Sequence, residues 1–291
     1  MISIDPERCT GCGLCAPLCV RGLLVPGQEG MEVLNPANCN GCGHCRAICP
    51  ADAPRLEGMV EAEYEPSPSP EEIPSPAAFL RFARSRRSVR RYKDRPVEEE
   101  KLWMIVEAGR FAPTGGNRQG IGFAVFRGRK VLDRVCYLAG EVLRDKGKRL
   151  REAREHSLRL KQPLPEEYRN ERYAPEIYER FAGQWEKGVD RLLHHAPALI
   201  LLHRKRGIVP RSELEVGIAS AHMVLMAETL GLGTCYIGFL ITAVETSEEL
   251  GGMLKIPADH QAHAALTLGY PQLRYRKLVA RNPARVEWIE E

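Results

Sequence analysis

The chain has 291 residues, enough for one large domain and a small one. Its hydrophobic content of 44% is ordinary for a globular protein, and 42 basic against 38 acidic residues are too evenly balanced to indicate nucleic-acid binding. It contains no run of about 18 apolar residues, so we expect no membrane-spanning helix and no membrane partner.

The N-terminal segment is rich in cysteine. Eight of the ten cysteines fall in the first 49 residues, as two copies of the spacing Cys-x2-Cys-x2-Cys-x3-Cys that begin at Cys9 and Cys39. Four thiolates at this spacing form the ligand set of a cubane iron–sulfur cluster. Glycines beside the cysteines let backbone amides approach the cluster sulfurs closely, and these are Gly11, Gly13, Gly41 and Gly43.

Disulfides and zinc are the alternatives for this segment. Disulfides need an oxidising compartment, yet residues 1–6 lack the basic and apolar stretches of an export signal. Zinc knuckles do not require the third cysteine that both copies contain. We therefore expect iron–sulfur clusters and a reducing, cytoplasmic location.

Residues 1–62 resemble a bacterial two-cluster ferredoxin. In such proteins the fourth cysteine of each motif ligates the other cluster. The resemblance therefore implies one [4Fe-4S] cluster on Cys9, Cys12, Cys15 and Cys49, and another on Cys39, Cys42, Cys45 and Cys19. Val20 departs from the pattern, because proline usually follows the fourth cysteine as Pro50 does here, but the number of ligands is unchanged.

A linker and a larger domain are predicted to follow. Residues 63–76 form the linker, since the five prolines between 64 and 76 disfavour both helix and sheet. From 77 to 291 helical and strand patterns alternate. Helices are predicted over 77–86, 97–110, most of 129–195, and 212–230; strands are predicted over 121–127, 198–202, 234–238 and 263–269.

The stretch 140–195 is predicted to be a helical insertion rich in aromatic residues, namely Tyr168, Tyr173, Tyr178, Phe181 and Trp185. Two interpretations stay open for these rings. They could pack as a helical core, or they could cover a bound planar group as a lid that excludes water.

An arginine-rich stretch opens the larger domain. Residues 86–91 read Arg-Arg-Ser-Val-Arg-Arg, and guanidinium groups with a hydroxyl suit a phosphate monoester. An arginine run by itself is also typical of a solvated surface. Two glycine-rich turns strengthen the phosphate interpretation: 112–119 offers backbone and amide donors, and 231–238 is a tight loop against which a flat ring could lie.

Together these three segments resemble the nitroreductase family of FMN enzymes over residues 80–285. The resemblance implies an α+β fold, a homodimer, and FMN at the subunit interface. It implies FMN contacts from Arg86, Arg87, Ser88 and Arg90 at the phosphate and ribityl end, from Asn117 and Gln119 at the ribityl chain or ring edge, from the backbone of Ile237 and Gly238, and from Arg281 or Lys277 at the phosphate. Gly120 stands where the family usually has proline. No side-chain acid or base is expected, because the flavin carries the chemistry.

The sequence thus indicates an FMN-dependent oxidoreductase fused to a two-cluster ferredoxin domain. The resemblance implies a nitro compound or quinone as the small-molecule acceptor, with soluble ferredoxin or NAD(P)H as donor. Tethering the electron donor to the flavin domain also raises the effective concentration of that donor near the flavin. The alternatives are a non-catalytic electron carrier or redox sensor, and another reduction on the same fold, such as reductive dehalogenation or reduction of an activated C=C bond.

Overall fold

The computed structural model describes residues 1–207 and 212–290 and divides the chain into two compact units. Unit 1 comprises Met1–Pro74 together with Thr114–Gln119, and unit 2 comprises Ser75–Pro113 and Gly120–Glu291. The first division falls inside the proline-rich stretch. The presence of Thr114–Gln119 in unit 1 is a feature that no pattern in the sequence indicates.

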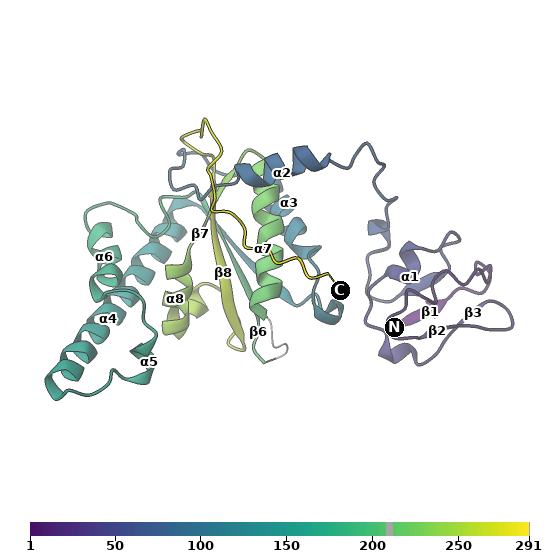
Figure 1. The fold of residues 1–291 in the computed structure, drawn as a ribbon, viewed down its shortest axis with the longest axis horizontal. Coiled ribbons are helices and arrows are strands. Elements are labelled where there is room, and N and C mark those ends of the chain that lie inside the picture. The colour runs from purple at the N-terminus through teal and green to yellow at the C-terminus, as the bar shows by residue number, and fades with distance from the viewer. Residues whose placement is uncertain (208–211, 291) are drawn as a thin grey trace. The chain divides into compact units, whose positions relative to one another are not determined.

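Unit 1 is built on two short antiparallel strand pairs (Figure 1). β1 (Ile2–Ile4) pairs with β4 (Pro54–Leu56), and β2 (Leu24–Pro26) pairs with β3 (Met31–Val33). The helices of this unit are the single turn α1 (His44–Ala47) and the 3-10 turns η1 (Pro36–Asn38), η2 (Glu61–Glu63) and η3 (Gly115–Asn117).

The core of unit 1 is small and includes cysteines. Cys15 and Cys45 are buried together with Ile2, Leu24 and Met31. A domain of this size buries little apolar surface, so groups bound by its cysteines are expected to contribute to its stability.

Unit 2 contains a four-stranded antiparallel sheet in the order β5-β6-β8-β7. Its strands are β5 (Ile121–Arg127), β6 (Ala198–Lys205), β7 (Gly233–Tyr236) and β8 (His260–Gly269). Every residue of β6 is buried except the last, Lys205. This confirms the prediction of a buried strand at 198–202. With helices on both faces, the fold is α+β, as expected.

Helices cover both faces of this sheet, and Figure 1 shows α7 and α8 on opposite sides of β8. The helices of unit 2 are α2 (Pro76–Ser85), α3 (Glu99–Arg110), α4 (Arg129–Leu160), α5 (Glu166–Arg169), α6 (Pro175–Trp185), α7 (Ser212–Thr229), α8 (Gly238–Thr246) and α9 (Glu248–Met253). Successive side chains of β6 point to opposite faces of the sheet, because side chains alternate along a strand. Leu199 and Leu201 pack with α4 and α8, whereas Ile200 and Leu202 pack with α3 and α7.

The observed elements of unit 2 follow the predicted ones with two local differences. No helix was predicted over residues 238–253, where α8 and α9 lie. Ser75 accepts a hydrogen bond from the amide of Ala78 at 3.3 Å, and Pro76 occupies the first helical position, so α2 has the N-terminus its sequence favours. The prediction of a strand through residue 238 was wrong, because β7 ends at Tyr236 and α8 begins at Gly238. None of the described helices is long and apolar enough to cross a membrane.

The aromatic residues of the 140–195 insertion form a packed core. Tyr178 and Phe181 are buried, and the Phe239 ring of α8 lies 4.7 Å from that of Phe181 and 5.0 Å from that of Tyr173, centroid to centroid. Tyr168 and Trp185 pack against the same cluster. These contacts support the core interpretation of the insertion rather than the lid.

A buried ion pair links the sheet to α7. Arg204 on β6 pairs with Glu215 on α7, and both side chains are more than nine-tenths buried. We expect Glu215→Ala to lower the free energy of unfolding of unit 2 by about 3–5 kcal/mol, since it leaves a buried charge without its partner. Chemical denaturation would measure this effect. The exposed Glu213, two residues earlier on the same helix, supplies the control, and equal stability losses at the two positions would contradict the prediction.

Candidate functional site

The structure brings the eight N-terminal cysteines into two groups, each of which mixes the two motifs. Burial raises the pKa of the Cys15 thiol, and the neighbouring Cys49, Cys12 and Cys9 raise it further. Cys49, from the second motif, therefore lies with three cysteines of the first.

The other group has the complementary composition. Cys19, Cys39, Cys42 and Cys45 line one small cavity. Burial and the neighbouring thiols of Cys42 and Cys39 raise the pKa of Cys45 to about 11. The fourth cysteine of each motif thus lies beside the other motif, as crossed ligation requires.

Backbone amides already point at several of these sulfurs. Leu23 donates to Cys19 Sγ at 3.3 Å and Ala53 donates to Cys49 Sγ at 3.4 Å, so the two copies use equivalent residues. Gly41 donates to Cys39 Sγ at 3.4 Å. Amide donors to thiolate sulfur are the contacts that stabilise an anionic cluster and tune its potential, so the residues present fit a cubane.

The glycines of both motifs have the backbone conformation that this arrangement needs. Gly11, Gly13, Gly41 and Gly43 all have positive φ, between 64° and 77°. Within the described residues, no set of three or more His, Cys, Asp or Glu side chains is close enough to hold a single metal ion, which is a different arrangement from four thiolates around a four-iron cluster.

The arginine-rich stretch lies extended beside β7. The amide of Val89 donates to the carbonyl of Thr234 at 2.8 Å, and Ser88 forms a parallel bridge with Thr234. Gly233 makes this approach possible, because a Cβ there would stand 2.5 Å from Cγ2 of Val89. In extended backbone, alternate side chains point to opposite faces.

One face of this stretch carries Arg86, Ser88 and Arg90. All three lower the pKa of the Cys235 thiol, and Cys235 is only 2% exposed. Burial raises the pKa of Cys235, while the charge of Arg90 and a hydrogen bond from Ser88 lower it. Nη1 of Arg86 is buried and has no hydrogen-bond partner among the described residues. A buried guanidinium donor without a partner is costly, so this side of the stretch fits an anionic group such as a phosphate.

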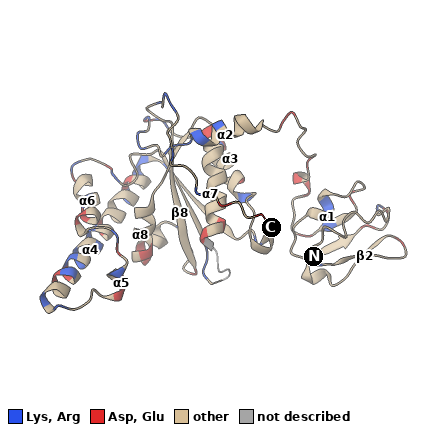
Figure 2. Cartoon of the chain, in the orientation of Figure 1, with Lys and Arg blue, Asp and Glu red and all other residues tan. Residues whose placement is uncertain are grey.

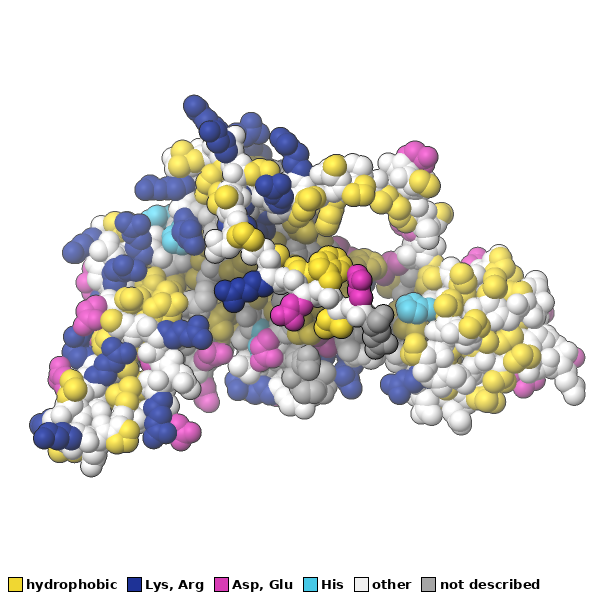
Figure 3. All heavy atoms as spheres, in the orientation of Figure 1, with side chains coloured by type: hydrophobic (Ala, Val, Ile, Leu, Met, Phe, Trp, Pro, Cys, Tyr) yellow, Lys and Arg dark blue, Asp and Glu magenta, His cyan; other side chains and the backbone are white. Residues whose placement is uncertain are grey.

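Arg87 points to the other face, into a cavity of about 1000 Å³. Figures 2 and 3 show Lys and Arg gathered over the loop that follows β8. The basic residues that line the cavity are Arg81, Arg87, Lys93, Arg274, Arg276 and Lys277. Lys277 therefore joins Arg87 rather than Arg86. Arg281 is exposed further along the tail, where its Nη1 donates to the carbonyl of Ala280 at 3.4 Å.

The other predicted flavin contacts are divided between the two units, with Ile237 and Gly238 in unit 2 and Asn117 and Gln119 in unit 1. The amide of Ile237 already donates to the carbonyl of Ala265 at 2.9 Å, whereas Gly238 is exposed in the first turn of α8. Asn117 and Gln119 belong to unit 1, with φ of 54° and 50°. Nδ2 of Asn117 donates to the carbonyl of Gly41 at 2.7 Å, a contact that no motif in the sequence predicts.

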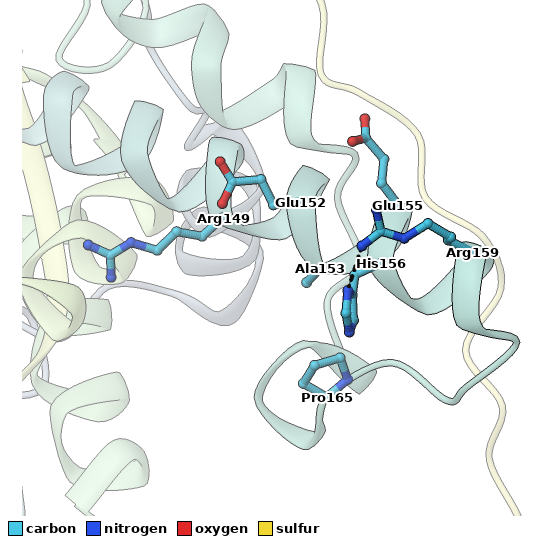
Figure 4. Close-up of a pocket in the computed structure, with 7 residues that line it drawn as sticks. All are labelled: Arg149, Glu152, Ala153, Glu155, His156, Arg159 and Pro165. Carbon is cyan, nitrogen blue, oxygen red and sulfur yellow. Dashed lines mark hydrogen bonds between the residues drawn. The ribbon is translucent and has the colours of Figure 1, made fainter.

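Two further features outside these sites have ordinary structural explanations. A hollow along α4 is lined by both signs of charge, and its His156 contacts Arg159 at 3.3 Å (Figure 4). Such a mixed surface is typical of a solvated helix face. Cys136 is buried and donates from Sγ to Oδ1 of Asp190 at 3.1 Å, consistent with an inert structural thiol.

Comparison with known proteins gives the family. The model of the nitroreductase family matches residues 83–270, and the model of the 4Fe-4S dicluster domain matches residues 1–50. The chain belongs to the nitroreductase family, a family of oxidoreductases, and carries an N-terminal 4Fe-4S ferredoxin domain.

Solved structures of the same fold include two nitroreductases with bound FMN. The one from Bacteroides fragilis NCTC 9343 has 20% identity and a TM-score of 0.53, and the match covers 72% of this chain and 98% of that one. The one from Desulfitobacterium hafniense DCB-2 has 18% identity and a TM-score of 0.52, over 72% and 97% of the two chains.

A curated relative from Archaeoglobus fulgidus carries the provisional name NADH dehydrogenase/NAD(P)H nitroreductase. It is 35% identical over 66 residues, which are 22% of this chain. The chain spans 38% of the length of that relative.

Proposed function

We propose that the chain is an FMN-dependent oxidoreductase that receives electrons through two [4Fe-4S] clusters and reduces an organic acceptor such as a nitro compound or a quinone. The observation that carries this proposal is the presence, in one polypeptide, of a nitroreductase-family domain and a dicluster domain whose cysteines gather in two groups. When bound, the clusters supply one-electron transfer and FMN supplies the link between one-electron and two-electron chemistry.

The residues of unit 2 would hold the flavin through its phosphate. Arg86, Ser88 and Arg90 offer cationic and hydroxyl donors on one face of the extended stretch, and the unpartnered Nη1 of Arg86 is a donor that a phosphate oxygen would satisfy. Nε of Arg87, on the other face, is a buried donor of the same kind. Arg87 and Lys277 border the neighbouring basic cavity and would act on the same phosphate or on a second charged group of the ligand. Gly238 would present backbone without a side chain to obstruct a flat ring.

The residues of unit 1 would hold the clusters in the crossed arrangement. Cys9, Cys12, Cys15 and Cys49 would bind one cluster, and Cys39, Cys42, Cys45 and Cys19 the other. The amides of Leu23 and Ala53 would stabilise the negative charge on the two exchanged cysteines.

We further propose a homodimer, as the family resemblance implies, in the reducing cytoplasm that the N-terminal cysteines favour. An exposed apolar groove between α3 and the edge strand β5 supports this proposal, with Leu102, Trp103 and Val125 among its lining residues. Trp103 is 60% exposed in the single chain, which is unusual for so large an apolar side chain outside an interface. Analytical ultracentrifugation should give twice the mass of the chain.

The test is anaerobic reduction of the holoprotein by soluble ferredoxin, NADH and NADPH in separate experiments, followed by mixing with nitroaromatic compounds or quinones. We expect at least one donor to bleach the flavin absorbance and at least one acceptor to restore it over many turnovers. If no acceptor turns over faster than it does with free FMN, the protein is an electron carrier or sensor and the enzymatic proposal fails. If only organohalides or activated alkenes were turned over, the protein would still be an enzyme, but its acceptors would be these compounds and not nitro compounds or quinones.

A further inference from the structure

A chain of hydrogen bonds leads from Asn117 to a predicted cluster ligand. Nδ2 of Asn117 donates to the carbonyl of Gly41 at 2.7 Å and to the carbonyl of Asn40 at 3.3 Å. The peptide group that contains the Asn40 carbonyl also contains the Gly41 amide, which donates to Cys39 Sγ at 3.4 Å. One peptide group therefore accepts from Asn117 and donates to sulfur.

This arrangement has an electronic consequence. Hydrogen bonds that share a peptide group polarise one another, so a donor at the carbonyl makes the N–H a stronger donor. A stronger N–H bond to the thiolate sulfur favours the cluster state with the greater negative charge, which is the reduced state. Asn117 would therefore raise the reduction potential of the cluster on Cys39.

The backbone around Asn117 is shaped for this contact. Gly116 and Asn117 have φ of 61° and 54°, a left-handed conformation that asparagine tolerates better than most residues. The amide of Gln119 donates to Oγ1 of Thr114 at 3.0 Å, which closes the short segment. Left-handed non-glycine residues cost free energy and are often found where a contact requires them.

We propose that Asn117 is a positioning residue for the second cluster: its side chain fixes and polarises the turn between Cys39 and Cys42 and so sets the potential of that cluster. The inference rests on the proposed function, because it requires a cluster on Cys19, Cys39, Cys42 and Cys45. It assigns Asn117 a role in unit 1 that is independent of flavin contact.

The experiment is a redox titration of the holoprotein followed by electron paramagnetic resonance, in which the two clusters are resolved as separate signals. Asn117→Gly removes the donor and suits the left-handed backbone. We expect it to lower the equilibrium constant for reduction of one cluster by up to about tenfold, which is 59 mV for one electron, while the other cluster keeps its potential. Asn117→Asp replaces the donor by an acceptor and should lower the same potential further.

Asn35 provides the matched control, because it lies in unit 1 with φ of 50° and makes no side-chain capping bond. Asn35→Gly repeats the same change of shape near Cys39 and should leave both potentials at their native values. Asn35→Asp adds the same charge near Cys39 without touching the polarised peptide group, so it should lower the potential by less than Asn117→Asp does. Native potentials in the Asn117 variants, or equal shifts in the Asn35 variants, would overturn the inference while leaving the proposed function intact. Absence of a second cluster from the native protein would instead overturn the proposed function, and the inference with it.

Discussion

Arg86→Ala is expected to weaken FMN binding by roughly 10- to 150-fold. Each hydrogen bond from a charged donor contributes about 1.5–3 kcal/mol, and a factor of ten corresponds to about 1.4 kcal/mol. The Nη1 of Arg86 is buried and lacks a partner among the described residues, so a phosphate would gain this contribution in full. Quenching of flavin fluorescence on titration with apoprotein measures the dissociation constant directly. Ser88→Ala should show a smaller loss in the same assay.

Arg84→Ala is the matched control, since it removes an exposed arginine at the end of α2. Its dissociation constant should equal that of the native protein. Arg87→Ala distinguishes the two faces of the extended stretch, because Arg87 lines the separate basic cavity. If the Arg86 variant bound FMN with native affinity, Arg86 would not contact the phosphate. If the Arg87 variant lost more affinity than the Arg86 variant, the phosphate would instead bind in the basic cavity.

Replacing a single ligand cysteine of unit 1 is also expected to have a large effect, namely the loss of one cluster. Cys12→Ala is expected to remove one cluster, to halve the iron and sulfide content, and to destabilise unit 1, whose core includes ligand cysteines. Because Cys49 lies with the cysteines of the first motif, Cys49→Ala should abolish the same paramagnetic signal as Cys12→Ala. Cys19→Ala should abolish the other signal.

The buried Cys136 of unit 2 supplies a control for loss of a thiol. Cys136→Ala should retain the full iron content. If the Cys49 and Cys19 variants each lost the signal that belongs to their own motif, crossed ligation would be wrong. Iron content at the native level in Cys12→Ala would remove the cluster assignment itself.

The sequence was most informative where chemistry depends on local spacing. Four cysteines within eleven residues restrict the ligand set strongly, because spacing along the chain largely determines which thiols can converge. The alternation of Leu199 and Ile200 between the two faces of the sheet likewise follows from the strand period.

Contacts between distant segments were harder to predict. Residues 86–91 read as one basic cluster in sequence, yet an extended backbone sends Arg86 and Arg87 to opposite faces. The aromatic insertion was ambiguous because only the pairing of α4 with α6 and the approach of Phe239 place its rings in a core. The bond from Asn117 to Gly41 joins residues 76 apart, and no local pattern encodes it.

The composition of unit 1 bears on how such a protein could arise or be dismantled. A polypeptide ending at Pro74 would contain every N-terminal cysteine but would lack Thr114–Gln119, six residues that belong to the same compact unit. Cutting the chain at the proline-rich stretch would therefore remove the hydrogen bonds that Asn117 donates to the carbonyls of Asn40 and Gly41. A transplant of residues 1–74 into another protein would leave behind a six-residue segment that lies within residues 83–270, the part of the chain that matches the nitroreductase family.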